Sequence, residues 1–238
     1  VSVKMDKAAK QVSVFNEKGV EVPAQFISYN NGEAKFMVAA QVPAISFVVY
    51  DVRVGKSNAK SALKVTNNAI ENSIYKVTLD KNGDISSIID KRNGKELVKS
   101  GKSIRLALFE ENESFSWPAW EILKKTVDKE PVSITENVKI SIAENGPIRG
   151  AICVERTYNE SKFKQYIRLT EGAQDDRIDF VSEVDWQTTN AWLKAEVPLT
   201  IDNEIATCDL VIGQIQRGNN NKTAYEVCAQ DWADLAEK

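Results

Sequence analysis

The segment Tyr75-Lys-Val-Thr-Leu-Asp-Lys-Asn-Gly-Asp-Ile-Ser-Ser-Ile-Ile-Asp90 carries two runs of alternating side chains around an Asn-Gly pair. Before the pair, apolar Tyr75, Val77 and Leu79 alternate with polar residues, which is the period of a strand with one buried face. Asn82-Gly83 supplies the positive φ angles that a tight hairpin turn requires. The segment therefore predicts an antiparallel β-hairpin.

The same turn dipeptide and the same alternating pattern recur along the chain. Asn-Gly occurs three more times, at residues 31–32, 93–94 and 145–146. Alternating apolar residues predict a second hairpin over 138–154 and a third over 163–186. No stretch shows the sustained 3.6-residue period of a long helix, and residues 230–237 alone could form a helical turn or two. We therefore expect an all-β protein.

Charge and hydropathy exclude several kinds of partner. Lys and Arg total 31 against 34 Asp and Glu in 238 residues, so no positive excess is available to neutralise phosphates or anionic lipids. No apolar run approaches the roughly 20 residues that cross a bilayer. We expect neither nucleic acid nor a membrane as a partner.

The chain contains no histidine, which excludes a Ser-His-Asp triad, a Cys-His pair and the common zinc sites that use histidine. A pair of carboxylates could still perform glycoside hydrolysis. Cys153, Cys208 and Cys228 are odd in number and widely spaced, so they form no CxxC motif. We expect them to be buried, unpaired thiols.

A polar, small-residue stretch at 55–62 separates two valine-rich regions. It predicts two β units, a small domain over 1–58 and a larger one over 59–238. Because the chain begins at Val1 rather than Met, we expect to be reading a processed or excised segment.

Several motifs occur in a fixed order along the chain. After shorter segments within 12–52 come Asn72-Ser-Ile-Tyr-Lys-Val-Thr-Leu-Asp80, Gly83-Asp-Ile-Ser-Ser-Ile-Ile-Asp-Lys-Arg-Asn-Gly-Lys-Glu-Leu97, Trp117-Pro-Ala-Trp-Glu-Ile122 and Trp192-Leu-Lys-Ala-Glu-Val-Pro-Leu199. Together they resemble glycoside hydrolase family 38 α-mannosidases, in the β-region that follows the catalytic domain. The resemblance implies a small immunoglobulin-like β-sandwich followed by a large galactose-mutarotase-like antiparallel sandwich. In the family the large sandwich continues beyond the point matched by Leu235, so the large domain is expected to be truncated at its C-terminal end.

The resemblance also implies a function. Family members are retaining, zinc-dependent hydrolases of terminal α-mannosidic bonds, and their nucleophile and zinc ligands lie on an upstream catalytic α/β domain. This chain has no histidine to match those ligands, so no catalytic or metal residue is carried over. The expected role is non-catalytic: the chain would support the catalytic domain of the same polypeptide and shape a cleft for mannose-containing glycans, with zinc bound in the catalytic domain.

Trp117, Trp120 and Glu121 are the candidate sugar-binding residues. Aromatic faces stack on pyranose rings, and a carboxylate accepts hydrogen bonds from hydroxyl groups. The competing interpretation makes the tryptophans core anchors, because Trp is highly buried on average. Pro118 stands where the family usually has Asp, which weakens any polar role carried over to that position.

Other interpretations stay open. An independent carbohydrate-binding module is the main alternative, since β-sandwiches with exposed tryptophans commonly hold sugars. A stand-alone mutarotase-like enzyme is disfavoured because that family's acid/base partner includes histidine. The acidic stretch containing Glu171, Asp175 and Asp176 has oxygen ligands suited to calcium but lacks the full calcium-loop spacing, so we expect a plain hairpin tip.

Overall fold

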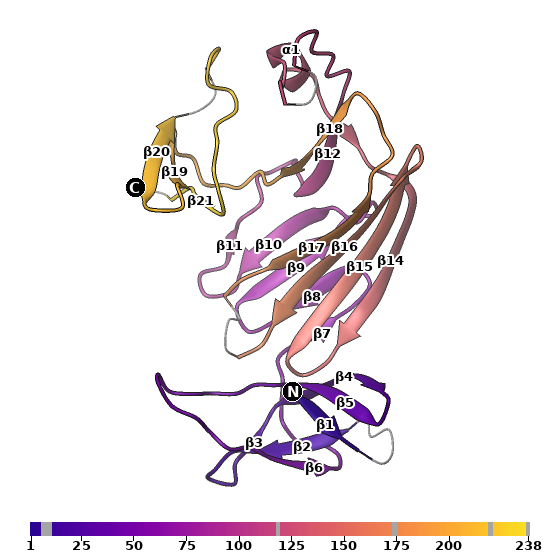
Figure 1. Cartoon of the computed structure of the whole chain (residues 1–238), viewed down its shortest axis with the longest axis vertical. Coiled ribbons are helices and arrows are strands. Elements are labelled where there is room, and N and C mark those ends of the chain that lie inside the picture. The colour runs from indigo at the N-terminus through magenta and orange to yellow at the C-terminus, as the bar shows by residue number, and fades with distance from the viewer. Residues whose placement is uncertain (6–10, 118–119, 173–175, 219–220, 237–238) are drawn as a thin grey trace.

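The computed structural model describes residues 1–5, 11–117, 120–172, 176–218 and 221–236. Over these ranges the chain is antiparallel β-sheet apart from loops and one short helix, α1 (Lys124–Val127). Figure 1 shows an N-terminal unit at one end, a larger sandwich above it, and a small C-terminal sheet at the side of the sandwich. The all-β sandwich class expected from the turn chemistry is confirmed.

The N-terminal unit consists of two three-stranded sheets that share one core. One sheet has the order β1-β5-β4 and the other β3-β2-β6. Their bounds are β1 (Ser2–Lys4), β2 (Val12–Phe15), β3 (Glu21–Val22), β4 (Ala24–Asn30), β5 (Glu33–Val38) and β6 (Asp51–Val54). Val12, Val14 and Phe36 are buried between the sheets, so alternation along each strand creates the core.

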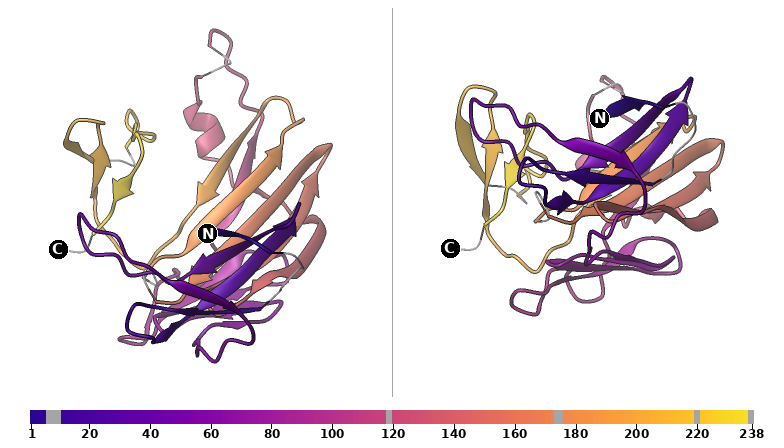
Figure 2. Two further views of the ribbon diagram at one scale, coloured as in Figure 1. Left: turned by 60° about the horizontal axis from the view of Figure 1, so that its bottom comes forward. Right: turned by 90° about the horizontal axis from the view of Figure 1, so that it is seen from below.

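Two larger sheets form the main sandwich, which Figure 2 shows as two layers when seen from below. The first has the order β11-β10-β9-β8-β7, with bounds β7 (Lys64–Val65), β8 (Ala69–Glu71), β9 (Tyr75–Leu79), β10 (Ile85–Asp90) and β11 (Lys95–Glu96). The second has the order β14-β15-β16-β17, with bounds β14 (Glu136–Asn145), β15 (Arg149–Tyr158), β16 (Ser161–Thr170) and β17 (Asp179–Asp185).

The sandwich core draws on both layers. Ile70 and Val77 of the first sheet are fully buried in the same cluster as Ile152 and Ile167 of the second. Burying a side chain of this size contributes about 1.5–3 kcal/mol. The apolar residues that alternate along the strands thus form one buried layer between the two sheets.

Two smaller sheets complete the fold. One has the order β13-β12-β18, with bounds β12 (Arg105–Glu110), β13 (Val132–Ser133) and β18 (Ala191–Glu196). The other has the order β20-β19-β21, with bounds β19 (Ile205–Asp209), β20 (Gln214–Gly218) and β21 (Ala233–Asp234). The first packs on its own cluster, which includes the buried Leu108 and Ile134.

The three predicted hairpins are confirmed by the strand pairing. β9 pairs with β10, β14 with β15, and β16 with β17, all antiparallel. At the first turn the Asp80 carboxylate accepts hydrogen bonds from the backbone N–H groups of Asn82 (2.8 Å) and Asp84 (3.0 Å). Gly83 has a φ of 78°, and a Cβ there would lie 2.5 Å from Val154 Cγ1. Glycine is therefore required by both conformation and packing.

Two expectations were wrong. Ala233 and Asp234 form strand β21 instead of a helical turn, because Asp209 on β19 holds this segment in extended form. The Asp209 N–H donates to the Trp232 carbonyl (3.0 Å), and its carboxylate accepts from the Asp231 N–H (3.2 Å). Cys153 and Cys208 are buried free thiols as expected, but Cys228 is exposed, because it lies outside any strand.

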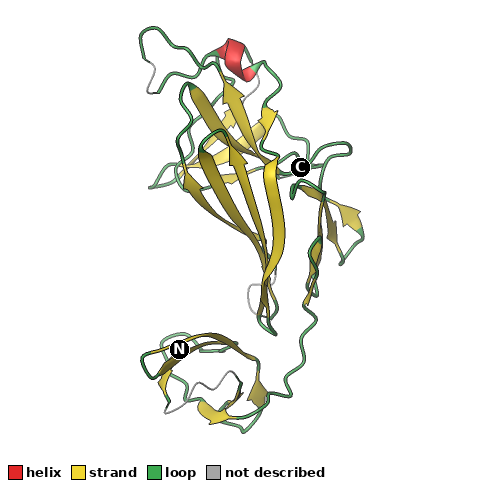
Figure 3. Ribbon diagram, turned by 90° about the vertical axis from the view of Figure 1, so that its right-hand side faces the viewer, coloured by secondary structure: helices red, strands yellow, loops and turns green. Residues whose placement is uncertain are grey.

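The N-terminal unit, which Figure 3 shows from the side at the end of the sandwich, is hydrogen-bonded to the turn between β14 and β15. The side chain of Gln25, on β4, extends to this turn, and the residue is only 7% exposed. A Cβ on Gly146 would lie 2.1 Å from Gln25 Cδ, so the glycine leaves room for the amide. The strand-free stretch between Val54 and Lys64 connects the two units, and the domain boundary at residue 58 stays a prediction.

Candidate functional site

The candidate tryptophans lie together on the loop between β12 and α1, which we call the aromatic loop (residues 111–123). Their rings are stacked, with centroids 5.2 Å apart and planes inclined by 22°. Trp117 is 53% exposed and Trp120 is 71% exposed, so neither ring is a core anchor. Pro118, where the family pattern departs, lies outside the described residues.

Asn112 closes the base of the aromatic loop. Its side-chain amide donates to the Glu121 carbonyl (2.9 Å), while its side-chain oxygen accepts from the Leu123 N–H (3.1 Å). One side chain thus joins the two ends of the loop. These two hydrogen bonds stabilise the conformation of a loop that has no regular secondary structure.

Glu121 is used within the loop. Its carboxylate Oε2 accepts a short hydrogen bond from the Ser114 hydroxyl, and that hydroxyl also accepts from the Trp117 N–H (3.0 Å). The Glu121 N–H donates in turn to the Trp117 carbonyl (2.9 Å). Glu121 therefore orients the tryptophan segment, and one of its carboxylate oxygens is already occupied.

A distant part of the chain braces the loop. The Tyr225 hydroxyl donates to the Ile122 carbonyl (2.8 Å), and Lys124 Nζ lies 5.8 Å from the centroid of the Tyr225 ring. The neighbouring Glu226 forms an ion pair with Lys194 of β18. The sequence analysis missed this contact, since no local pattern signals a partner about a hundred residues away.

The arrangement suits stacking on a flat apolar surface. The two indoles are stacked on each other, and each residue is more than half exposed to solvent. The apolar face of a pyranose ring is a suitable partner for such a surface. The structure thus brings the three predicted residues together: the two rings are stacked and exposed, and the Glu121 carboxylate is hydrogen-bonded within the loop.

A hollow of about 670 Å³ opens beside β12 and β18, and charged side chains are among the residues that line it. Arg105 in its wall pairs with Glu196 (2.7 Å) and Glu130 (3.2 Å). At its margin, Asp84 forms a buried ion pair with Arg156 (2.5 Å). Burial raises the pKa of the Asp84 carboxyl, and the Arg156 guanidinium opposes this rise. These ion pairs are formed within the protein, which indicates a structural network.

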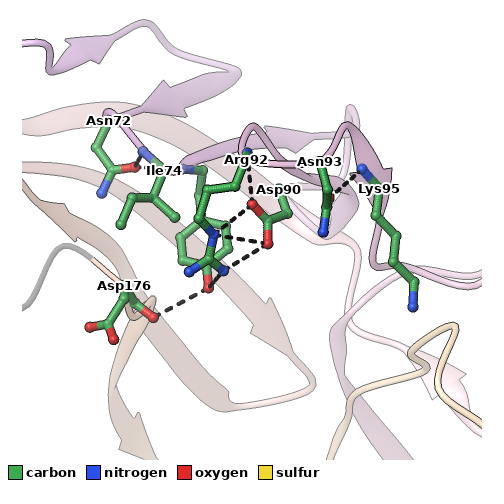
Figure 4. A network of polar contacts seen from close by, with 8 residues as sticks. Asn72, Ile74, Asp90, Arg92, Asn93, Lys95 and Asp176 are labelled. Atoms are coloured by element: carbon green, nitrogen blue, oxygen red, sulfur yellow. Dashed lines mark hydrogen bonds and ion pairs between the residues drawn. The ribbon is translucent and has the colours of Figure 1, made fainter. Parts of the chain in front are cut away.

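The acidic stretch after β16 behaves as a hairpin tip where it is described. The Glu171 carboxylate accepts from the Ser73 N–H (2.9 Å). The Asp176 carbonyl accepts from the Tyr75 hydroxyl (3.3 Å), which in turn accepts from Arg92 Nη2 (3.4 Å). Figure 4 shows Asp176 close to Arg92 and Asp90. Asp175 lies outside the described residues. These two acidic residues are thus tied to the first hairpin of the sandwich.

The Asp90–Arg92 pair in Figure 4 has fork-like geometry. Arg92 Nε donates to Asp90 Oδ1 (2.9 Å) and Nη2 donates to Oδ2 (2.7 Å). The hydrogen bond from Arg92 holds the pKa of the Asp90 carboxyl below its usual value. The pair fastens the turn that follows β10.

The described residues contain no group of three His, Cys, Asp or Glu side chains that could hold a metal ion. The described residues therefore do not fit a zinc site. Within the described ranges, no helix is both long enough and apolar enough to span a bilayer.

Residues 70–238 match the sequence profile described as the glycosyl hydrolases family 38 C-terminal domain. Alpha-mannosidase 2C1 of Mus musculus is 26% identical over 174 residues, covering 71% of this chain and 17% of that protein. Alpha-mannosidase G of Dictyostelium discoideum is 30% identical over 183 residues, covering 71% of this chain and 16% of that protein. The chain thus spans about a sixth of the length of these curated relatives.

Two solved structures share the fold. An alpha-mannosidase from Enterococcus faecalis V583 has a TM-score of 0.66 at 14% identity, covering 98% of this chain and 32% of that one. A glycosyl hydrolase family 38 protein from Enterococcus faecalis has a TM-score of 0.63 at 16% identity, covering 90% of this chain and 30% of that one. Because the family profile matches most of its length, the chain belongs to glycosyl hydrolase family 38 and carries the family's C-terminal domain.

Proposed function

We propose that this chain is the non-catalytic β-sandwich portion of an α-mannosidase. It supports the catalytic α/β domain of the same polypeptide and shapes that domain's cleft for mannose-containing glycans. The observation that carries the proposal is the family match to a C-terminal domain, combined with coverage of about a sixth of the curated relatives. The parent reaction is proposed to be the retaining, zinc-dependent hydrolysis of terminal α-mannosidic bonds, with zinc bound in the catalytic domain.

The residue inventory supports a non-catalytic role. The chain has no histidine, and two acidic residues of the aromatic loop are engaged in internal bonds, Glu121 with Ser114 and Glu111 with Lys129. A glycosidase needs two carboxyl groups held across a glycosidic bond, and in this proposal they lie in the catalytic domain. We expect no hydrolysis of mannosides by the isolated chain.

In this proposal Trp117 and Trp120 contact the glycan. Their exposed outer faces stack on sugar rings at the edge of the cleft, while Glu121 holds the loop that carries them. Stacking of this kind requires rings that are already oriented, because ordering them on binding costs conformational entropy. The bonds from Asn112 and Tyr225 supply that orientation.

An independent carbohydrate-binding module is the second candidate. The stacked, exposed tryptophan pair favours it, because the pair is preformed within this chain and needs no other domain to complete it. The two functions differ in one measurable property. A module binds free mannosides, whereas a supporting portion needs the catalytic domain to complete the site.

A heteronuclear NMR titration with α-linked mannobiose separates the two. For the supporting role we expect no saturable shift of the tryptophan indole signals at high millimolar sugar. Saturable shifts of the Trp117 and Trp120 signals, lost in Trp120→Ala and kept in Trp232→Ala, would establish a module instead. In the full-length enzyme, Trp120→Ala should raise KM for a glycan substrate more than it lowers kcat, because it removes binding outside the reacting centre.

A further inference from the structure

Two exposed turns share an unusual backbone feature. Ile45 has a φ of 51° with its side chain fully exposed, and Val211 has a φ of 70° with 72% exposure. A β-branched residue at positive φ is strained, because its side chain crowds the backbone. The other non-glycine residues with positive φ in the described ranges are asparagine or glutamate: Asn31, Glu111, Asn137, Asn159 and Asn190. Strain therefore coincides with exposed apolar side chains at these two turns.

The first turn belongs to the long apolar loop between β5 and β6. No residue from 36 to 50 is charged, and Val42, Phe47 and Val49 of the loop are exposed together with Ile45. The loop is closed at its base by Tyr50, whose hydroxyl accepts from the Gln41 N–H (2.9 Å) and donates to the Gln41 carbonyl (3.2 Å). The loop is thus a fixed projection that presents apolar groups to water.

The second turn, residues 210–213, joins β19 to β20. The Asp209 carboxylate accepts from the Val211 N–H (3.0 Å), which fixes the turn, and the Ile212 side chain is almost wholly exposed. Polar residues or glycine usually occupy such turns and would relieve the strain, whereas this turn carries the exposed apolar Val211 and Ile212.

Both turns lie on one side of the molecule. In Figure 1 the loop after β5 and the β19–β20 sheet both project to the left, and both views of Figure 2 keep them on the same side. They come from opposite ends of the chain. We define residues 42–49 and 210–212 as the apolar flank.

We propose that the apolar flank is the docking surface for the catalytic domain of the same polypeptide. This inference rests on the proposed function. The partner surface is apolar and uncharged, because a charge facing the flank would be desolvated without a counter-ion. The structural neighbours extend well beyond the region that this chain covers, 30–32% of their length. A domain linked in the same chain has a high effective concentration, which favours it over a second copy.

Hydrogen–deuterium exchange on the full-length polypeptide and on this chain alone tests the proposal. We expect the backbone amides of 39–50 and 208–214 to exchange about tenfold more slowly in the full-length polypeptide, because docking removes them from solvent. The turn at 16–20, whose Val20 is also exposed, is the internal control and should not change.

Glycine variants sharpen the test. Ile45→Gly and Val211→Gly remove an apolar side chain and relieve the positive-φ strain. We expect this chain alone to unfold at the same or a higher temperature, while the full-length polypeptide loses the extra exchange protection. The matched control Val20→Ser should keep that protection.

The outcomes are distinguishable. Protection of other segments of this chain with none on the flank would overturn the docking surface and leave the supporting role intact. No protection anywhere in the chain would overturn both. Self-association of the chain by sedimentation, abolished by Phe47→Ser, would assign the flank to a second copy and also overturn the proposal.

Discussion

Gln25 and Arg149 exchange hydrogen bonds across the junction between the N-terminal unit and the sandwich. The Arg149 N–H donates to Gln25 Oε1 (2.8 Å), and Gln25 Nε2 donates to the Arg149 carbonyl (3.0 Å). The Gln25 oxygen also accepts from the Ile148 N–H (3.1 Å). A side-chain amide thus pairs with the end of β15 as a neighbouring strand would, and it couples the two units through backbone groups.

Gln25→Ala should lower the free energy of unfolding by about 1–3 kcal/mol, because it leaves backbone groups at a buried junction without partners. Urea denaturation measures the change. Gln165→Ala is the matched control: its side chain makes an exposed hydrogen bond to Ser182, so the expected change is within about 0.5 kcal/mol. Equal effects in the two variants would contradict a special role for Gln25.

Gly146→Ala should destabilise the protein through Gln25. The new Cβ would lie 2.2 Å from Gln25 Oε1, so the amide must move away from Arg149. The cost should shrink in a Gln25→Ala background, because the clashing atoms are then absent. A double-mutant cycle of unfolding free energies measures this coupling. If the two free-energy changes are strictly additive, Gly146 is needed for the conformation of the turn and not for its contact with Gln25.

The Asp84–Arg156 ion pair is 6% and 2% exposed at its two side chains. Asp84→Asn should cost about 3–5 kcal/mol, since it leaves a buried guanidinium without a counter-ion. Asp179→Asn, which breaks the more exposed pair with Arg177, should cost less than about 1 kcal/mol. Chemical denaturation compares them, and a small effect at Asp84 would mean that water reaches Arg156.

Tyr158 should ionise at unusually high pH. Its hydroxyl donates to the Glu110 carboxylate, and this hydrogen bond raises the pKa of Tyr158 to about 12. Because the folded-state pKa is raised, the stabilisation is complete below the ordinary value near 10 and disappears as pH rises through about 12. The difference in 295 nm absorbance between wild type and Tyr158→Phe reports the titration. Glu110→Gln should move the midpoint downward, and an unchanged midpoint would contradict this cause.

The Asp90–Arg92 pair should make part of the stability sensitive to acid. The pKa of Asp90 is lowered from 3.8 by the hydrogen bond from Arg92, so its contribution is present above that value and is lost as pH falls below it. Asp90→Asn should therefore flatten the decline of unfolding free energy below about pH 4. Urea titrations at several pH values test this, and an unchanged slope would assign the acid sensitivity to other carboxylates.

Local patterns predicted the hairpins well. Val77 and Leu79 before the Asn82-Gly83 turn are buried and paired as alternation indicated, because strand period and turn geometry depend on neighbouring residues. Burial was less predictable. Trp117 and Trp120 are exposed although Trp is usually buried, and Cys228 is exposed although free cysteine is usually buried. Average burial tendencies do not describe residues on a projecting loop.

The sequence by itself determined the all-β class, the three long hairpins and the resemblance to family 38, because alternation, turn residues and ordered motifs are properties of contiguous segments. Tertiary structure alone decided the stacking of the candidate tryptophans and the capture of residues 230–234 by Asp209. It also decided the pairing of Gln25 with Arg149 and the placing of two apolar turns on one side. These features join residues far apart in the chain, and their positions depend on how whole sheets pack, which no local pattern specifies.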